Sequence, residues 1–189
     1  MRFAFVVYDG LTLLDFAGVY DPVTRLKTMG FKDDFEYRVC AMKQTVRTIE
    51  GLEMTVDQVG EPLDGYDVIF IPGGSGVSAL FGDTAFMQWI KSAAPHTVMS
   101  AVCGGTLVLG ALGLLKGRRA TTHPALMQHL ARFTEQPCED RIVDEGSVIT
   151  ARGVTSAIDL GLYLCERIAG KEVREKIQQQ MDYSAYCFD

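Results

Sequence analysis

Residues 97–110 read TVMSAVCGGTLVLG, and this stretch decides how the chain is interpreted. An apolar, β-prone run leads into Cys103, Gly104 and Gly105 follow, and a helix-like pattern begins after them. This order is typical of a nucleophile elbow, in which a strand carries a reactive side chain to the edge of a sheet. Ala101 takes the place of the first glycine in the serine version of the motif. We expect the following helix N-terminus to lower the pKa of the Cys103 thiol.

The segments around the elbow alternate between strand-like and helix-like patterns. This alternation predicts an α/β sandwich around a mostly parallel sheet. The length and the lack of a repeat or linker predict one domain over residues 1–189. The predicted strands are 1–8, 35–41, 66–71 and 97–102, with hairpins at 46–56 and 141–151 and a short extended piece at 120–123. The predicted helices are 11–29, 84–94, 104–115, 124–133, 155–169 and 173–181.

The composition excludes several classes of partner. The net charge is −6, which argues against the basic face that binding to nucleic acids or anionic membrane surfaces requires. No apolar run approaches the ~20 residues that span a bilayer, and the first residues do not form a signal peptide. We therefore expect a cytoplasmic protein that acts on a small molecule.

The five cysteines are Cys40, Cys103, Cys138, Cys165 and Cys187. Their count is odd, their spacing is wide, and no Cys-x-x-Cys pair occurs. This pattern predicts reduced thiols and neither a disulfide framework nor a metal site. Only Cys103 has a special backbone context.

A nucleophilic cysteine needs a partner that handles protons. His96 is expected at the opposite end of the sheet and His129 on the surface. His123 follows a short extended segment and can reach the strand ends, although a structural role fits it equally well. Asp15 is an acid within an apolar run, where it is either a helix cap or a functional group. Burial beside a thiol would raise the pKa of Asp15.

A glycine turn follows the predicted strand at 66–71. Gly73 and Gly74 can supply a backbone N–H to developing negative charge, and Gly104 can supply a second. A plain turn is the alternative. The lysine of a phosphate-binding loop and the spacing of a dinucleotide fingerprint are absent, so no nucleotide cofactor is expected.

Four ordered motifs together resemble the ThiJ/PfpI superfamily, and more narrowly its isonitrile hydratase group. They are Leu14-Asp15-Phe16-Ala17-Gly18, Phe70-Ile71-Pro72-Gly73-Gly74, Ala101-Val102-Cys103-Gly104-Gly105 and Ala120-Thr121-Thr122-His123. The resemblance implies a flavodoxin-like sandwich, a homodimer and no metal or organic cofactor.

The resemblance also implies a mechanism. Cys103 would be the nucleophile, Asp15 the acid bonded to it, and Gly73, Gly74 and Gly104 the lining of an oxyanion pocket. The thiolate would attack the terminal carbon of an isonitrile, and water would release an N-substituted formamide. In the hydratases a threonine follows the cysteine, whereas this chain has Gly104.

Two other functions use the same residues. One is a glyoxalase- or amidase-like activity on another small electrophile. The other is a sensor of a small ligand or of an oxidant, and in the second case Cys103 is oxidised to a sulfinic acid that Asp15 stabilises. We rank the hydratase first, the other enzymatic activity second and the sensor third, and the sensor ranks below the enzymes because the predicted pocket also provides what turnover requires.

Overall fold

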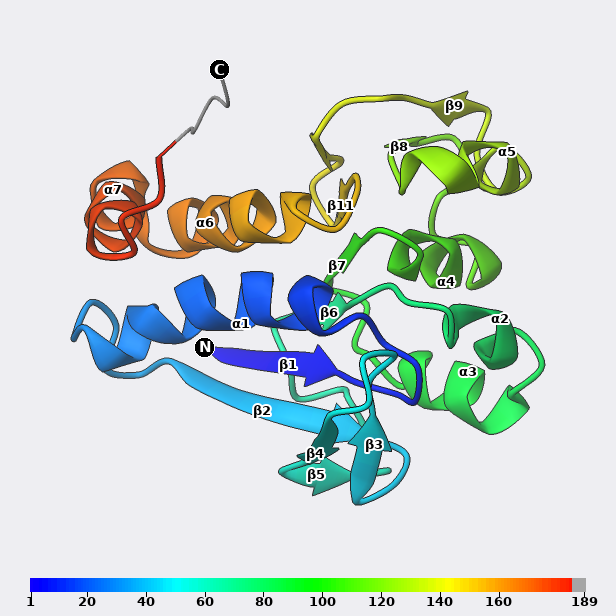
Figure 1. Cartoon of the computed structure of the whole chain (residues 1–189), viewed down its shortest axis with the longest axis horizontal. Coiled ribbons are helices and arrows are strands. Elements are labelled where there is room, and N and C mark those ends of the chain that lie inside the picture. The colour runs from blue at the N-terminus through cyan, green and yellow to red at the C-terminus, as the bar shows by residue number, and fades with distance from the viewer. Residues whose placement is uncertain (185–189) are drawn as a thin grey trace.

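The computed structural model describes residues 1–184, and its centre is a seven-stranded sheet (Figure 1). The strand order is β10-β11-β7-β6-β1-β2-β5. Every neighbouring pair is parallel except β10 and β11. The strands are β1 (Arg2–Val6), β2 (Glu36–Ala41), β5 (Gln58–Val59), β6 (Val68–Ile71), β7 (Val98–Val102), β10 (Ile142–Asp144) and β11 (Val148–Ala151). The predicted α/β sandwich with a mostly parallel sheet is confirmed.

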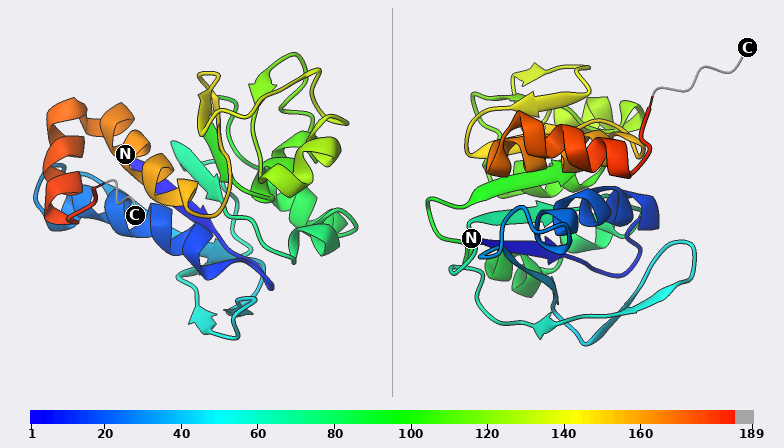
Figure 2. Two further views of the ribbon diagram at one scale, coloured as in Figure 1. Left: turned by 45° about the horizontal axis from the view of Figure 1, so that its top comes forward. Right: turned by 90° about the vertical axis from the view of Figure 1, so that its left-hand side faces the viewer.

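Helices cover both faces of this sheet (Figure 2). One group is α1 (Leu13–Thr28), α6 (Ser156–Ala169) and α7 (Lys171–Gln180), and the other is α2 (Val77–Leu80), α3 (Thr84–Ile90) and α4 (Gly105–Ala111). Helices α1 and α6 lie very close together, since a Cβ on Gly18 would stand 2.7 Å from the Cβ of Ala157. The covered faces explain why β6 is buried at every residue, as is typical of a parallel sheet between helices.

The local predictions differ from the structure mainly in helix length. The predicted helix at 124–133 is split into a 3-10 turn, η1 (Pro124–Leu126), and α5 (Met127–Leu130). Leu126 has φ −109° and ψ 4°, which interrupts the helix. Helix α4 ends at Ala111, and the left-handed Gly113 follows soon after.

Four short strands lie outside the main sheet. β3 (Thr45–Arg47) and β4 (Glu53–Thr55) form the predicted antiparallel hairpin. β8 (Arg119–Ala120) and β9 (Gln136–Pro137) pair in parallel, and β9 had no signal in the sequence.

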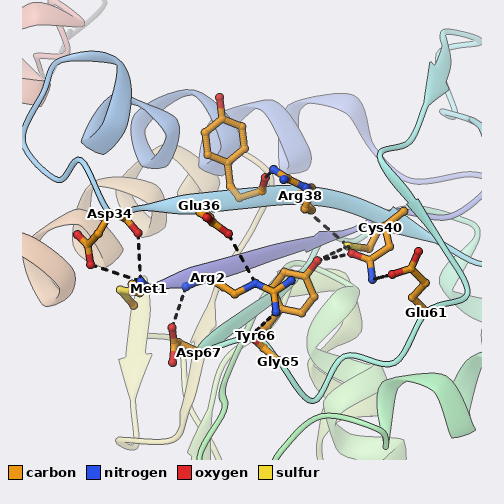
Figure 3. A network of polar contacts seen from close by, with 12 residues as sticks. Met1, Arg2, Asp34, Glu36, Arg38, Cys40, Glu61, Gly65, Tyr66 and Asp67 are labelled. Atoms are coloured by element: carbon orange, nitrogen blue, oxygen red, sulfur yellow. Dashed lines mark hydrogen bonds and ion pairs between the residues drawn. The ribbon is translucent and has the colours of Figure 1, made fainter.

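Figure 3 shows a network of polar contacts around β1 and β2, part of which lies at the N-terminal ends of β1 and β6. The Arg2 backbone N–H donates to Asp67 Oδ2 at 2.7 Å, and the Arg2 guanidinium donates to Gly65 O at 3.1 Å. The same guanidinium lies 4.7 Å from the ring centroid of Tyr66. These contacts join β1 to the start of β6, at the sheet end opposite to Cys103.

Across residues 1–184, no helix is both long enough and apolar enough to cross a bilayer. Nor do three or more His, Cys, Asp or Glu side chains gather there as metal ligands would.

Candidate active site

The candidate site lies where the C-terminal ends of β1, β6 and β7 meet. After β1 the chain runs to β2 on one side, whereas β6 and β7 lie on the other side of β1. Such a change of direction is the usual place for a binding site in a parallel sheet. The site receives Asp15 from α1, Gly73 from the turn after β6, and Cys103 from the turn after β7.

Cys103 occupies a strained backbone conformation. Its φ is 56°, one of two positive values among the non-glycine residues of the described chain. This conformation costs roughly 1–3 kcal/mol and persists only when its surroundings fix it. The Cys103 N–H donates to Ala151 O at 3.1 Å and to Arg152 O at 2.9 Å, and its carbonyl accepts from Thr122 Oγ1 at 2.6 Å. These bonds hold the predicted elbow on both sides of the cysteine.

The neighbouring glycines have different reasons to be glycine. A Cβ on Gly105 would stand 2.4 Å from Ile71 O, so no side chain fits there. Gly104 has an ordinary φ of −62°, and a Cβ on it would make ordinary contacts with Leu126 Cδ1 and Val77 Cγ2 at 3.4 Å and with Gly74 N at 3.8 Å. The backbone strain therefore lies in Cys103 itself and not in Gly104.

Gly73 is enclosed by the other members of the site. A Cβ there would lie 2.6 Å from Gly104 N, 2.7 Å from Asp15 Oδ2 and 2.8 Å from Cys103 Cβ. Real Cβ atoms essentially never come so close to such atoms. Gly73 therefore lets the acid and the cysteine approach each other, a contact that the sequence did not reveal.

Asp15 is a buried acid in the first turn of α1. The N-cap of this helix is Thr12, so the alternative of Asp15 as a cap does not apply. Asp15 is 0% exposed, and its Oδ2 accepts from Gly73 N at 2.9 Å. Its Oδ1 has no hydrogen-bond partner within residues 1–184. One carboxyl oxygen is thus held by the backbone, and the other remains available.

Burial raises the pKa of the Asp15 carboxyl to about 7. The Gly73 N–H and the Cys103 thiol oppose this rise, and the charge of Glu50 adds to it. An acid with this pKa exchanges protons readily near neutral pH, as a general acid or base must. The expected rise in the pKa of Asp15 is therefore found.

The Cys103 thiol behaves differently from the sequence-based expectation. Burial, together with the charge of Asp15, raises its pKa to about 12, and the Gly104 N–H opposes this rise. The prediction that the helix N-terminus lowers the pKa of this thiol is wrong, because the effect of burial is larger than the effect of the short helix α4. The Cys103 thiol therefore keeps its proton near neutral pH, where the Asp15 carboxyl is about half ionised, and the charge of Asp15 no longer disfavours the thiolate once Asp15 is protonated.

The three predicted oxyanion donors divide into two groups. The Gly73 N–H is already used by Asp15. The N–H groups of Gly74 and Gly104 donate to no oxygen atom of residues 1–184. Gly74 has φ 133°, and a Cβ on it would stand 2.2 Å from Gly10 O, so only glycine fits.

The histidines contribute no visible proton relay. His123 is half-buried, and its Nδ1 accepts from the Ala125 N–H at 3.2 Å, which caps η1. No hydrogen bond within residues 1–184 joins it to Cys103 or Asp15. His96 and His129 are exposed, as predicted for His129. Cys40, Cys138 and Cys165 are free thiols, and Cys187 lies outside the described residues.

Three contributors to the site were missed in the sequence. Thr122 holds the Cys103 carbonyl, and the hydroxyl of Tyr8 donates to Pro72 O at 2.6 Å. Glu50, at the tip of the β3–β4 hairpin, accepts from the Leu13 N–H at 3.1 Å. Thr122 stands next to His123 in a motif already singled out, but Tyr8 and Glu50 carry no local signal.

Comparisons with known proteins show which family the chain resembles. A profile of the DJ-1/PfpI family matches residues 1–167. Isonitrile hydratase of Pseudomonas putida is 34% identical over 185 residues, covering 97% of this chain and 79% of that protein. The crystal structure of a ThiJ/PfpI family protein from Pseudomonas syringae superposes with a TM-score of 0.85 at 30% identity, covering 98% and 76% of the two chains. Schizosaccharomyces pombe DJ-1 shares the fold, with a TM-score of 0.83 at 21% identity over 97% and 100%.

The fold and the site thus define a flavodoxin-like α/β protein with a cysteine at a strained strand-to-helix turn. The chain belongs to the DJ-1/PfpI family.

Proposed function

We propose that the protein is an isonitrile hydratase that converts an isonitrile and water into an N-substituted formamide. The observation that carries this proposal is the pairing of a fully buried Asp15, which has one unbonded oxygen, with the strained Cys103. The similarity to the Pseudomonas putida hydratase supports it. Besides the isonitrile, the reaction consumes only water, so its balance requires no redox or group-transfer cofactor.

The first step forms a carbon–sulfur bond. The sulfur of Cys103 attacks the terminal carbon of R–N≡C, and the thiol proton reaches that carbon through Asp15. The product is a thioimidate, R–N=CH–S–Cys103. A free thiolate need not accumulate, because Asp15 can receive and deliver the proton as the bond forms. The pKa of about 7 suits Asp15 to both transfers.

The second step releases the product. Water gives one proton to Asp15 as its oxygen adds to the thioimidate carbon, and Asp15 passes that proton to the nitrogen, which forms R–NH–CH(OH)–S–Cys103. The carbon–sulfur bond then breaks as the hydroxyl group loses its proton, and that proton returns to the sulfur. The products are R–NH–CHO and the Cys103 thiol. The N–H groups of Gly74 and Gly104, which donate to no oxygen atom of residues 1–184, are the donors that we assign to the oxygen of this intermediate.

The surroundings of Cys103 favour a narrow substrate with an apolar substituent. Cys103 is 7% exposed, so only a slender reacting end reaches its sulfur without rearrangement. The isonitrile carbon is terminal and linear. Val77 and Leu126 flank the adjacent Gly104, and they offer apolar contacts to the substituent.

Turnover of a small panel tests the proposal. The panel contains an alkyl isonitrile, methylglyoxal and a peptide amide, each with Cys103→Ala as the control. We expect formamide from the isonitrile, and its loss in Cys103→Ala. Isonitrile turnover that persists in Cys103→Ala would refute the mechanism, and turnover confined to methylglyoxal or the amide would replace the hydratase with that activity.

We also propose that the protein is a homodimer, as the family resemblance implies. Leu14, Ile49 and Leu52 are 41%, 50% and 50% exposed, and the segments that carry them are joined by the bond from Ile49 N to Leu11 O. Light scattering should give twice the mass of the chain, and Ile49→Lys should lower it. A monomeric wild-type protein would contradict this proposal.

A further inference from the structure

The hydroxyl of Tyr8 is a buried polar group that the proposed mechanism leaves unused. Tyr8 follows β1 and is 5% exposed. Its hydroxyl donates to Pro72 O at 2.6 Å. Its ring meets Phe86 edge-on, with the centroids 6.1 Å apart. Packing of the ring and the hydrogen bond together fix the direction of the hydroxyl.

This hydrogen bond reaches Asp15 through a single peptide unit. The Pro72 carbonyl and the Gly73 N–H belong to the same planar group. Tyr8 binds its oxygen at 2.6 Å, and Asp15 Oδ2 accepts from its nitrogen at 2.9 Å. Hydrogen bonds in such a chain polarise one another, so a donor on the carbonyl strengthens the N–H as a donor.

The Pro72–Gly73 peptide needs an external partner to stay in place. Gly73 must be glycine because a Cβ would collide with Asp15 and Cys103. Glycine, however, leaves the backbone torsion beside this peptide unusually free. The following peptide is fixed by the bond from Thr12 N to Gly73 O at 2.9 Å. Among residues 1–184, the only hydrogen bond to the Pro72 carbonyl comes from Tyr8.

We propose that Tyr8 is a positioning residue whose hydroxyl holds the Pro72–Gly73 peptide so that the Gly73 N–H stays on Asp15 and sets its proton affinity. The inference rests on the proposed function only in giving Asp15 the role of acid. Burial, followed by the charges of Asp15 and Cys103, holds the pKa of Tyr8 well above its ordinary value. The phenol therefore remains a hydrogen-bond donor throughout the neutral range.

Tyr8→Phe tests the proposal, with Tyr66→Phe as the matched control. Tyr66 (Figure 3) is 2% exposed, and its hydroxyl bonds to Gln58 of β5, the strand at the far edge of the sheet. Both variants lose one buried hydroxyl and keep the ring. The measurement is the rate at which iodoacetamide alkylates Cys103 between pH 5 and 10, read on the Cys103 peptide by mass spectrometry without substrate.

The Gly73 N–H lowers the pKa of Asp15, so a loosened Gly73 bond raises it. In Tyr8→Phe we expect the first midpoint of the Asp15–Cys103 pair to rise by about half a pH unit or more. Tyr66→Phe should keep the wild-type midpoint. A folded Tyr8→Phe protein with an unchanged midpoint would overturn the proposal, as would an equal shift in Tyr66→Phe.

Turnover separates this inference from the proposed function. With an alkyl isonitrile, Tyr8→Phe should lower kcat about fivefold and leave KM unchanged, with the same upward shift in the pH profile. If no panel compound is turned over, the hydratase proposal fails, whereas the alkylation midpoint still decides the role of Tyr8.

A second measurement covers the case in which Tyr8→Phe does not fold. In the wild-type protein labelled with ¹³C at the tyrosine Cζ atoms, one resonance should titrate with the midpoint of Asp15. That inflection should vanish in Asp15→Asn, because the Tyr8 hydroxyl senses the charge of Asp15 through the Pro72–Gly73 peptide, whose N–H donates to Asp15. A wild-type spectrum in which no tyrosine Cζ follows Asp15 would refute the inference.

Discussion

Replacing Asp15 by asparagine should remove most of the fall in stability that the wild-type protein shows between pH 5 and 7. The pKa of Asp15 rises from 3.8 to about 7 because the carboxyl is buried. Between these two values the folded protein keeps the proton and the unfolded chain has lost it. The folded state then binds more protons, so its stability decreases as the pH rises.

The size of this effect follows from the span between the two pKa values. Each pH unit changes the free energy of unfolding by about 1.4 kcal/mol, which gives about 4 kcal/mol over the whole window. Between pH 5 and 7 the free energy of unfolding of the wild-type protein should fall by about 2.5 kcal/mol relative to that of Asp15→Asn. Asparagine keeps the acceptor for Gly73 N and adds a roughly pH-independent offset of about 1–3 kcal/mol for its buried NH₂ group.

Urea denaturation at several pH values measures this difference. Trp89 is the single tryptophan and is buried, with its Nε1–H donating to Glu61 O at 2.7 Å, so its fluorescence reports unfolding. With a slope of about 2 kcal/mol per molar urea, the urea midpoint of the wild-type protein should fall by about 1 M relative to that of Asp15→Asn between pH 5 and 7. A difference between the two proteins that stays constant from pH 5 to 7 would show that Asp15 is not a proton-retaining acid, and the proposed mechanism would lose its proton carrier.

Three other substitutions, with Gly104→Ala as a control, probe the site by stability and activity. Gly73→Ala forces a Cβ against Asp15 and Cys103, so the free energy of unfolding measured in urea should fall by about 1–3 kcal/mol and turnover should be lost. The control Gly104→Ala should fold normally in the same assay. Thr122→Val removes the 2.6 Å hydrogen bond to the Cys103 carbonyl. Urea unfolding should show a free energy of unfolding lower by about 1 kcal/mol, and isonitrile assays should show a lower kcat. His123→Ala removes the cap of η1, which should cost about 1 kcal/mol; a loss within error would show that the bond to Ala125 N contributes little.

Much of the fold was predictable because its elements carry local signals. Buried parallel strands are continuous apolar runs, as at β6 and β7, and the sequence placed both within two residues of their observed bounds. The first helix was predicted to end at residue 29, and α1 ends at Thr28, with the left-handed Gly30 (φ 71°) just beyond it. Short elements such as β5 and α2 were missed, because two to four residues carry too little periodicity to be recognised.

The candidate site was only partly predictable. Cys103 stood out because the strand, the cysteine and the glycines are adjacent in the chain. Asp15 was left between two roles, because its burial depends on a turn 58 residues away. Tyr8 and Glu50 gave no signal, since each acts through a partner on another segment.

The sequence alone determined the alternation of strands and helices, the cysteine at a strand-to-helix turn, and the glycines around it, because these features depend on neighbouring residues. Only the tertiary structure decided how the site is charged. Packing buries Cys103 together with Asp15, and burial raises both pKa values, whereas the local pattern predicted an acidic thiol. Desolvation depends on everything that surrounds a group, so no local stretch of sequence can fix it.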